Sequence, residues 1–469
     1  MSTTTPASSP ATGGSADGTS SADLLVAERP AGAGPRPYTF PEVRRVRVAG
    51  GEIVAAHLPG RAMAWAGLVL EAGALHEPAG LEGLSRATGG LLDEGTENYS
   101  ADGFALAVEG LGARWTWGHE WETQSIGVDI PVARLADGVD LLAEAVRRPA
   151  FTDHDVERFL ADIASSLKHQ WAQPGTRAQE TYRRALFGPD SRYGSLLDGT
   201  PASNAEVTAD HIRDFHARRM TAPGTLVVAA DLDAVDLEAL GRAVFEGASG
   251  PDGRADAPPA AHDPAGVRVL LVDRPGAVQS VLRIGHTAPP RSTPDLVAID
   301  LFSEVLGGSF TSRLNHQLRE VKGYTYGAGA SFAHGRRVGT FTVAASVHTE
   351  VTADAVADAL AEVRRMHEHG VTDEEFVTTK THVLGSVPIR LQTPRGIGGR
   401  VREAVVHGLP DDHVTRQYAE FVAAEPAEAT RAAATYLRPD ALTIVVEGDA
   451  AKVLPGLEAA GFDVTQAPD

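Results

Sequence analysis

Two stretches of the 469-residue sequence hold residue types and spacings that bear on chemistry. In residues 306–332, LGGSFTSRLNHQLREVKGYTYGAGASF, Arg319 offers a guanidinium and Tyr326 a phenol. Both groups donate hydrogen bonds and can stabilise an oxygen that gains negative charge. A structural alternative is that Arg319 caps a helix or forms a salt bridge, and that Tyr326 fills space on a half-buried strand.

The second stretch, GLSRATGGLLDEGT at residues 83–96, predicts a helix without metal ligands. A zinc site on a helix needs imidazoles on one face, four residues apart, and a further carboxylate can come from another helix. This helix has no imidazole, and its Gly89 and Gly90 each cost about 1 kcal/mol relative to alanine. The two glycines either allow another segment to approach closely or mark relaxation after a lost function. The sequence leaves both interpretations open.

The elements that must position these residues follow from local patterns. Residues 306–332 predict a helix through Arg319, a helix end at Lys322-Gly323 and a strand from Tyr324. Residues 113–131 predict two strands around Gly118-His119-Glu120. Helical and strand-like runs of this kind alternate along both halves of the chain, which indicates an α+β fold with helices on one face of a sheet.

Three segments recur in the same order at offsets of roughly 210–220 residues, which indicates duplication of a whole domain. The recurring pairs are 64–78 with 278–290, 151–163 with 371–383, and 225–241 with 442–461. Each member of the second pair opens with Thr-Asp, which is typical of a helix N-terminus. We therefore expect a low-complexity tail (1–37), a first domain (38–246), a linker (247–266) and a second domain (267–469).

Composition excludes several classes of protein. The chain is 43% hydrophobic, has no cysteine and carries a net charge of −20. It therefore has no disulfide or thiolate metal site, and its charge argues against nucleic-acid binding. No apolar run reaches eighteen residues, so no membrane span is expected. The first residues lack a basic start and an apolar core, so we expect no secretory signal and a cytoplasmic location.

The helix at 83–96 resembles the motif region of the pitrilysin/insulinase-like zinc peptidases and processing peptidases. In that family Gly-Leu-Ala precedes His-x-x-Glu-His, and Gly-Thr follows. On this frame Arg86 stands at the first ligand position, Gly89 at the general base and Gly90 at the second ligand. The third ligand, a Glu about 75 residues further on, falls at Ser166. The resemblance implies that this chain binds no zinc, and no His-x-x-Glu-His or His-Glu-x-x-His occurs elsewhere in it.

Residues 306–332 resemble the second-half signature of the same family, Gly-Gly-x-x-x-Ser-Arg-Leu followed by Leu-Arg-Glu-x-x-Gly-x-x-Tyr. The resemblance implies that Arg319 and Tyr326 bind the substrate backbone near the scissile bond, facing a zinc site across a chamber. It also implies two homologous domains, each a mixed or antiparallel sheet with helices on one face, which form a clam-shell half-chamber. A peptide could add to an edge strand that comprises Gly112, Ala113, Arg114, Trp115 and Thr116.

The leading hypothesis from the sequence is a non-catalytic, substrate-binding subunit of a heterodimeric zinc endopeptidase. A homologous partner with His-x-x-Glu-His would hold the zinc ion, and this chain would be inactive alone. One alternative is a catalytically inactive structural homologue, like the core subunits of respiratory complexes. Another is an independent peptide-binding module. We expect a peptide substrate, and neither a nucleic acid nor a membrane as a partner.

Overall fold

The computed structural model describes residues 37–250, 253 and 260–467, and Pro37–Asp469 form one compact unit. The predicted tail, apart from residue 37, and the middle of the predicted linker lie outside the described residues. The domain boundaries expected from the sequence therefore stay predictions. No helix in the described part of the chain combines the length and the apolar character that a membrane crossing requires.

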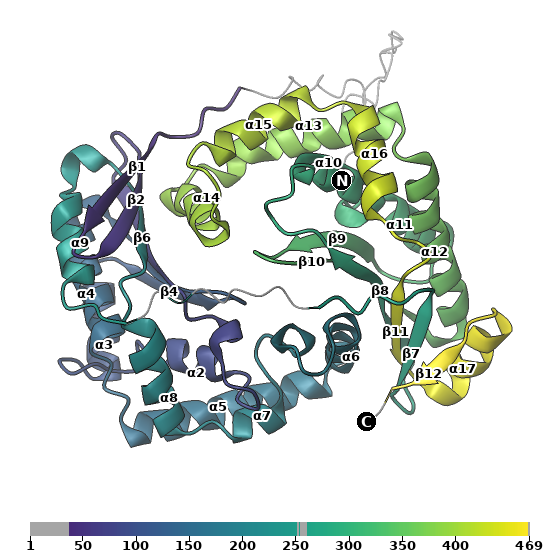
Figure 1. The fold of residues 1–469 in the computed structure, drawn as a ribbon, viewed down its shortest axis with the longest axis horizontal. Coiled ribbons are helices and arrows are strands. Elements are labelled where there is room, and N and C mark those ends of the chain that lie inside the picture. The colour runs from purple at the N-terminus through teal and green to yellow at the C-terminus, as the bar shows by residue number, and fades with distance from the viewer. Residues whose placement is uncertain (1–36, 251–252, 254–259, 468–469) are drawn as a thin grey trace, which may run out of the picture. The chain divides into compact units, whose positions relative to one another are not determined.

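Two six-stranded sheets, one from each half of the chain, form the framework (Figure 1). The first sheet contains, in spatial order, β1 (Val43–Val48), β2 (Gly51–His57), β6 (Thr225–Ala230), β3 (Met63–Leu70), β5 (Gln124–Pro131) and β4 (Arg114–His119). The second contains β12 (Val464–Gln466), β7 (Arg268–Asp273), β11 (Thr443–Gly448), β8 (Gln279–Ala288), β10 (Gly339–His348) and β9 (Ala328–His334).

Five strands follow the same path in both sheets. The pairs β2–β6 and β7–β11 are parallel, whereas the three pairs that follow in each sheet are antiparallel. The register repeats as well, because Ala66 pairs with Val128 as Leu282 pairs with Ala345. The prediction of two homologous α+β domains is therefore confirmed.

The helices also recur in order. Those of the first half are α2 (Leu84–Gly90), α3 (Ala101–Gly110), α4 (Leu135–Arg147), α5 (Asp153–Ala172), α6 (Thr176–Phe187), α7 (Pro201–Ala205), α8 (Ala209–Phe215) and α9 (Leu237–Phe245). Those of the second half are α10 (Leu296–Ser303), α11 (Arg313–Asn315), α12 (Thr352–His369), α13 (Asp373–Arg390), α14 (Pro394–His407), α15 (His413–Ala423), α16 (Pro426–Tyr436) and α17 (Ala450–Ala459). Shorter turns used below are η3 (Arg192–Gly194), η5 (Leu232–Ala234), η6 (Glu304–Gly308) and η7 (His316–Val321).

The two long helices that open with Thr-Asp begin where the sequence predicts. The Thr152 hydroxyl accepts a hydrogen bond from the Asp155 backbone N–H at 3.2 Å at the start of α5. Thr372 accepts one from the Glu375 N–H at 3.3 Å, and the Glu375 carboxylate accepts the Thr372 N–H at 2.9 Å. These bonds satisfy N–H groups that have no partner inside the helix.

One helix of each half packs on the sheet of the other half. Helix α14 lies against β3, β6 and β2, and α6 lies against β11, β8 and β7 (Figure 1). In the first case Ile397 and Val401 join Trp65 in one buried apolar cluster. In the second, Tyr182 joins Val281 in another. The sequence indicates helices on one face of each sheet, but this exchange covers the opposite face too.

A buried carboxylate on the second sheet fixes the start of α6. Glu447 accepts hydrogen bonds from the backbone N–H groups of Gly175 at 2.8 Å and Ala178 at 3.2 Å. Its second oxygen accepts one from Arg274 at 3.0 Å. A negative charge at a helix N-terminus stabilises the free N–H groups there. The chain between α5 and α6 is thereby attached to the second sheet.

The packing of α14 gives a matched pair of glycine substitutions. A Cβ at Gly398 would lie 2.2 Å from the Trp65 ring, so Gly398→Ala is expected to lower the free energy of unfolding by about 1–3 kcal/mol. At Gly399 nothing lies within 4 Å of a Cβ. Gly399→Ala should therefore raise the free energy by about 0.5–1 kcal/mol, through helix propensity. Urea unfolding followed by tryptophan fluorescence measures both variants, and equal effects would contradict this packing.

Candidate functional site

Helix α2, which carries the expected ligand positions, is fixed at its N-terminus by a buried carboxylate. Glu77 Oε1 accepts hydrogen bonds from the backbone N–H groups of Gly83 at 3.1 Å and Ser85 at 2.8 Å. Its Oε2 accepts one from Arg192 Nε, in η3, at 2.7 Å. Burial raises the pKa of Glu77, although Arg192 and the two backbone N–H groups act in the opposite direction. The position of α2 thus depends on contacts outside the helix.

Arg86, at the first ligand position, takes part in a charge cluster. The Asp198 carboxylate lies 3.6 Å from Arg86 Nη1 and 3.0 Å from His119 Nε2. The hydrogen bond from His119 and the positive charge of Arg86 hold the pKa of Asp198 below its usual value, against the effect of burial. His119 is the last residue of β4, and not part of a turn as the sequence predicts. Neither His119 nor Asp198 shows a sequence signal that links it to Arg86.

Gly89 and Gly90 allow other side chains to lie directly against α2. A Cβ at Gly89 would lie 2.2 Å from Gln124 Oε1, and one at Gly90 would lie 2.5 Å from the Phe159 ring and 3.2 Å from the Trp117 ring. Of the two interpretations that the sequence leaves open, the structure favours close approach.

The four positions together offer almost no donor atoms to a metal ion. A guanidinium has no free lone pair, a glycine has no side chain, and Ser166 has only a hydroxyl group. Ser166 is half-buried on α5, the helix that places Phe159 against Gly90. The residues present do not fit a zinc ion.

Arg319 lies near the end of η7 and already has partners. Its guanidinium stacks on the Phe310 ring, 3.7 Å from the ring centroid, and forms an ion pair with the neighbouring Glu320. Phe310 is 73% exposed, whereas the Arg319 side chain beneath it is only 17% exposed. No sequence pattern points to a role for Phe310, although it lies inside the same motif.

Tyr326 is 91% exposed, so the interpretation of this residue as half-buried strand filler is wrong. The strand β9 begins at Ala328 and not at Tyr324. The Thr325 hydroxyl explains the late start: it donates to the Ser346 carbonyl at 2.6 Å and accepts from the Gly327 N–H at 3.1 Å. A side chain thus takes the place of a backbone ladder bond.

Within the described residues, Arg319 and Tyr326 do not contact α2, the helix that carries the expected ligand positions. No hydrogen bond, ion pair or ring contact that involves either residue reaches α2. Tyr326 itself has no such partner within the described part of the chain. Its phenol is therefore open to a ligand.

The Ser-Arg-Leu part of the motif has a structural role. Arg313 donates two hydrogen bonds of 2.7 Å to the Glu375 carboxylate and one of 2.8 Å to the Gly370 carbonyl. Burial alone would raise the pKa of Glu375, but the bonds from Arg313 and Thr372 outweigh it and hold the pKa at about 2. This bidentate pair ties the motif to the start of α13.

The predicted peptide-binding strand is the outer strand of the first sheet. β4 pairs only with β5 among the described strands, so one side of its backbone stays unpaired there. Gly112 and Ala113 precede β4, which starts at Arg114. Trp115 packs edge-on against Phe104 at 5.3 Å and belongs to the core surroundings.

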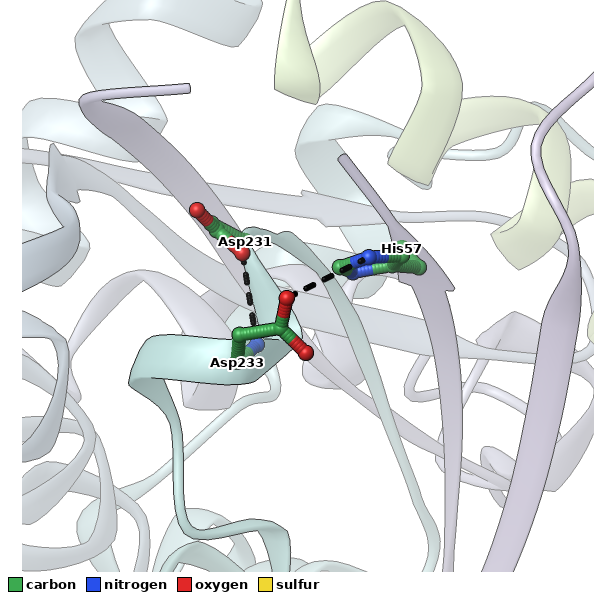
Figure 2. A group of neighbouring side chains, drawn as sticks. All are labelled: His57, Asp231 and Asp233. Carbon is green, nitrogen blue, oxygen red and sulfur yellow. Dashed lines mark hydrogen bonds and ion pairs between the residues drawn. The ribbon is translucent and has the colours of Figure 1, made fainter. Parts of the chain in front are cut away.

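A different group of residues has the composition of a metal site. Figure 2 shows His57, at the end of β2, close to Asp231 and Asp233, whose oxygens lie within 4.8 Å of a ring nitrogen. However, His57 Nδ1 accepts the Leu232 N–H at 3.2 Å, so in the neutral ring Nε2 carries the proton and has no lone pair for a metal. Asp231 accepts the Gly60 N–H at 2.8 Å. These bonds give the group a structural role around η5.

Both halves of the chain match family models of the M16 peptidases. Residues 52–196 match the family model described as Insulinase (Peptidase family M16), and residues 206–383 match the model Peptidase M16 inactive domain. A crystal structure of a peptidase M16 inactive domain from Pseudomonas fluorescens aligns with a TM-score of 0.80 and 23% identity, over 87% of this chain and 98% of the other. A protease structure from Helicobacter pylori aligns with a TM-score of 0.79 and 18% identity.

The related sequences carry names of two kinds. An uncharacterized zinc protease of Mycobacterium tuberculosis is 28% identical over 365 residues, which are 74% of this chain and 80% of the relative. One of Streptomyces coelicolor is 26% identical over 372 residues, 76% of this chain and 79% of the relative. A protein of Helicobacter pylori named a non-peptidase homologue is 24% identical over 319 residues, 66% of this chain and 72% of the relative.

The packing at α2 predicts the effect of two alanines. Gly89→Ala and Gly90→Ala should each lower the free energy of unfolding by about 1–3 kcal/mol, because the added methyl group would overlap Gln124 or Phe159. Gly385→Ala in α13 is the control, since nothing lies within 4 Å of a Cβ there. It should stabilise the protein by about 0.5–1 kcal/mol. Chemical denaturation distinguishes these signs, and stabilisation by Gly89→Ala would refute the close approach.

The Arg313–Glu375 pair predicts a pH dependence. Because the folded pKa of Glu375 is about 2, below the unfolded value of about 4.3, its stabilising contribution is complete above that unfolded value. The contribution is lost as the pH falls through the folded pKa. The difference in unfolding free energy between the wild type and Glu375→Gln should therefore be largest near neutral pH and shrink between about pH 4.3 and 2. A difference that does not vary over this window would show that the pair is not formed.

Proposed function

Because the chain belongs to the insulinase-like M16 peptidase family, we propose that it is the non-catalytic, substrate-binding subunit of a heterodimeric zinc endopeptidase. A homologous partner with His-x-x-Glu-His would supply the zinc ion and the general base. This chain would supply Arg319, Tyr326 and half of a closed chamber. The substrates would be short or unfolded peptides.

The main evidence for this proposal is that the residues at the expected ligand positions of α2 are held by other contacts. Arg86 is paired with Asp198, and Gly89 and Gly90 pack against Gln124 and Phe159. An inactive site of this kind cannot be restored by adding metal, because the ligand atoms are absent. The name of the Helicobacter pylori relative, a non-peptidase homologue, supports a chain without catalytic activity of its own.

The exposure of Tyr326 supports retention of peptide binding. A tyrosine that is 91% exposed and without a partner among the described residues contributes nothing to packing. Beside a substrate, its hydroxyl and the fork of Arg319 would orient the scissile carbonyl and stabilise the charge that develops there. Arg319 would first have to exchange its contact with Glu320 for the ligand. The open side of β4 would offer backbone hydrogen bonds to an extended peptide.

The proposal predicts activity only in the assembled enzyme. The purified chain should show no zinc-dependent cleavage of unstructured peptides, whereas addition of a His-x-x-Glu-His homologue should restore it. Arg319→Ala and Tyr326→Phe should each lower kcat/KM of the assembled enzyme by about 10²-fold, through loss of a donor to the developing oxyanion. Fluorogenic peptide assays measure turnover, and size-exclusion chromatography measures assembly, which should be unchanged.

The control is Tyr324→Phe, which removes the same hydroxyl from a partly buried tyrosine that packs on the core. It should leave turnover unchanged. Zinc-dependent cleavage by the chain alone would refute the proposal. Full activity of the assembled enzyme with Arg319→Ala would instead favour a purely structural homologue.

A further inference from the structure

A cavity of about 410 Å³ lies between α10, η6, α13, α15 and β9 of the second half, and Tyr38 and Phe40 of the first half also line it. It is separate from Arg319 and Tyr326, which do not line it. Its place in the fold corresponds to that of the expected metal-ligand positions on α2 in the first half.

The strand registers make Trp117 and Ala330 equivalent. Val128 pairs with Trp115 as Ala345 pairs with Ala328, and the next residues on the same strand faces are Trp117 and Ala330. Each lies against a helix glycine: Trp117 against Gly90, and Ala330 against Gly307, where a Cβ would lie 2.1 Å from the Ala330 nitrogen. In the first half an indole ring lies at this place. In the second half a methyl group lies there, and the cavity stays open.

Two acidic side chains line the cavity one helical turn apart. Asp300 belongs to α10, and Glu304 begins η6. Within the described residues, neither carboxyl group accepts a hydrogen bond or forms an ion pair. Burial raises the pKa of Asp300 to about 6. Like charges at this spacing destabilise a helix, so packing alone gives no reason for the pair.

Two of the arginines that line the cavity, Arg291 and Arg400, already have acidic or polar partners. Arg291 donates to Glu403 at 2.7 Å, and Arg400 forms an ion pair with the same carboxylate. Arg400 also donates to Gln417. Arg390, at the exposed end of α13, lies at the rim. Arg291 and Arg400 still attract Asp300 and lower its pKa against the effect of burial, but within the described residues neither forms an ion pair with it.

Aromatic rings form much of the remaining wall. The rings belong to Tyr38, Phe40, Phe332, Tyr418 and Phe421. Aromatic faces attract organic cations and also bury their apolar portions. A concave site with an apolar wall and a few charged groups is the usual form of a small-molecule site.

We propose that this cavity binds an organic cation, namely a primary amine on an aromatic or aliphatic body. The ammonium group would lie between the carboxylates of Asp300 and Glu304, and the apolar body would contact the rings. In the second half a ligand would thus occupy the position that the Trp117 ring fills in the first half. This proposal does not depend on the peptidase partner.

Calorimetric titration of the full chain with three probes tests the proposal. The probes are 2-phenylethylamine, 2-phenylethanol and 3-phenylpropionate, which share the ring and differ in the polar end. We expect one amine site with a Kd of about 10 µM to 1 mM, and no measurable binding of the other two. Asp300→Asn and Glu304→Gln should each weaken amine binding at least about tenfold. Their melting temperatures should be unchanged or higher, because a like-charge pair is removed.

Two further variants complete the experiment. Ser386→Leu keeps all charges but fills the cavity, so it should abolish amine binding. Glu420→Gln removes an exposed charge from α15 outside the cavity and should leave the affinity unchanged. Tighter binding of phenylpropionate than of the amine would assign the cavity to the arginines and overturn the proposal. So would the absence of binding by all three probes, or unchanged amine affinity in both acid variants.

Discussion

Reciprocal packing of α6 and α14 on the opposite sheets is the constraint on which the rest of this structure depends. With both faces of each sheet covered, the central strands are buried along almost their whole length, which explains the apolar runs LVVAA in β6 and IVV in β11. The exchange also fixes the segments that lead into α6 and α14. Since α5 and α13 immediately precede them, it determines where the helices beside both equivalent sites lie.

The two equivalent sites show how a duplicated fold can treat one location differently. In the first half, Trp117 and Phe159 lie against the glycines of α2, and charge pairing occupies Arg86. In the second half, Ala330 leaves room for a cavity. The absence of zinc ligands in the first half therefore coincides with dense packing, and not with a vacant pocket. A large difference in side-chain volume at one equivalent position of the two edge strands, Trp117 in β4 and Ala330 in β9, separates the two outcomes.

Features set by local sequence were predictable, and those set by distant contacts were not. The Thr-Asp starts of α5 and α13 follow from short patterns, the internal duplication follows from segments that recur in order, and the edge position of β4 follows from the family resemblance. The strand start at Tyr324 was wrong because period-two alternation cannot show that Thr325 bonds the neighbouring strand with its side chain. The partners of Arg86 and the helix exchange involve residues more than 30 positions away. One sequence contains no pattern for such pairs.

The mutual dependence of the halves bears on how such a chain could arise. An ancestor with a single sheet would have exposed one apolar face of that sheet to water, because the helix that covers it belongs to a second copy. Two identical subunits that exchanged this helix would have covered both apolar faces as a domain-swapped homodimer. Fusion of the tandem genes would then have preserved the helix exchange within one polypeptide. From that moment each copy could change its inner surface without having to match the other.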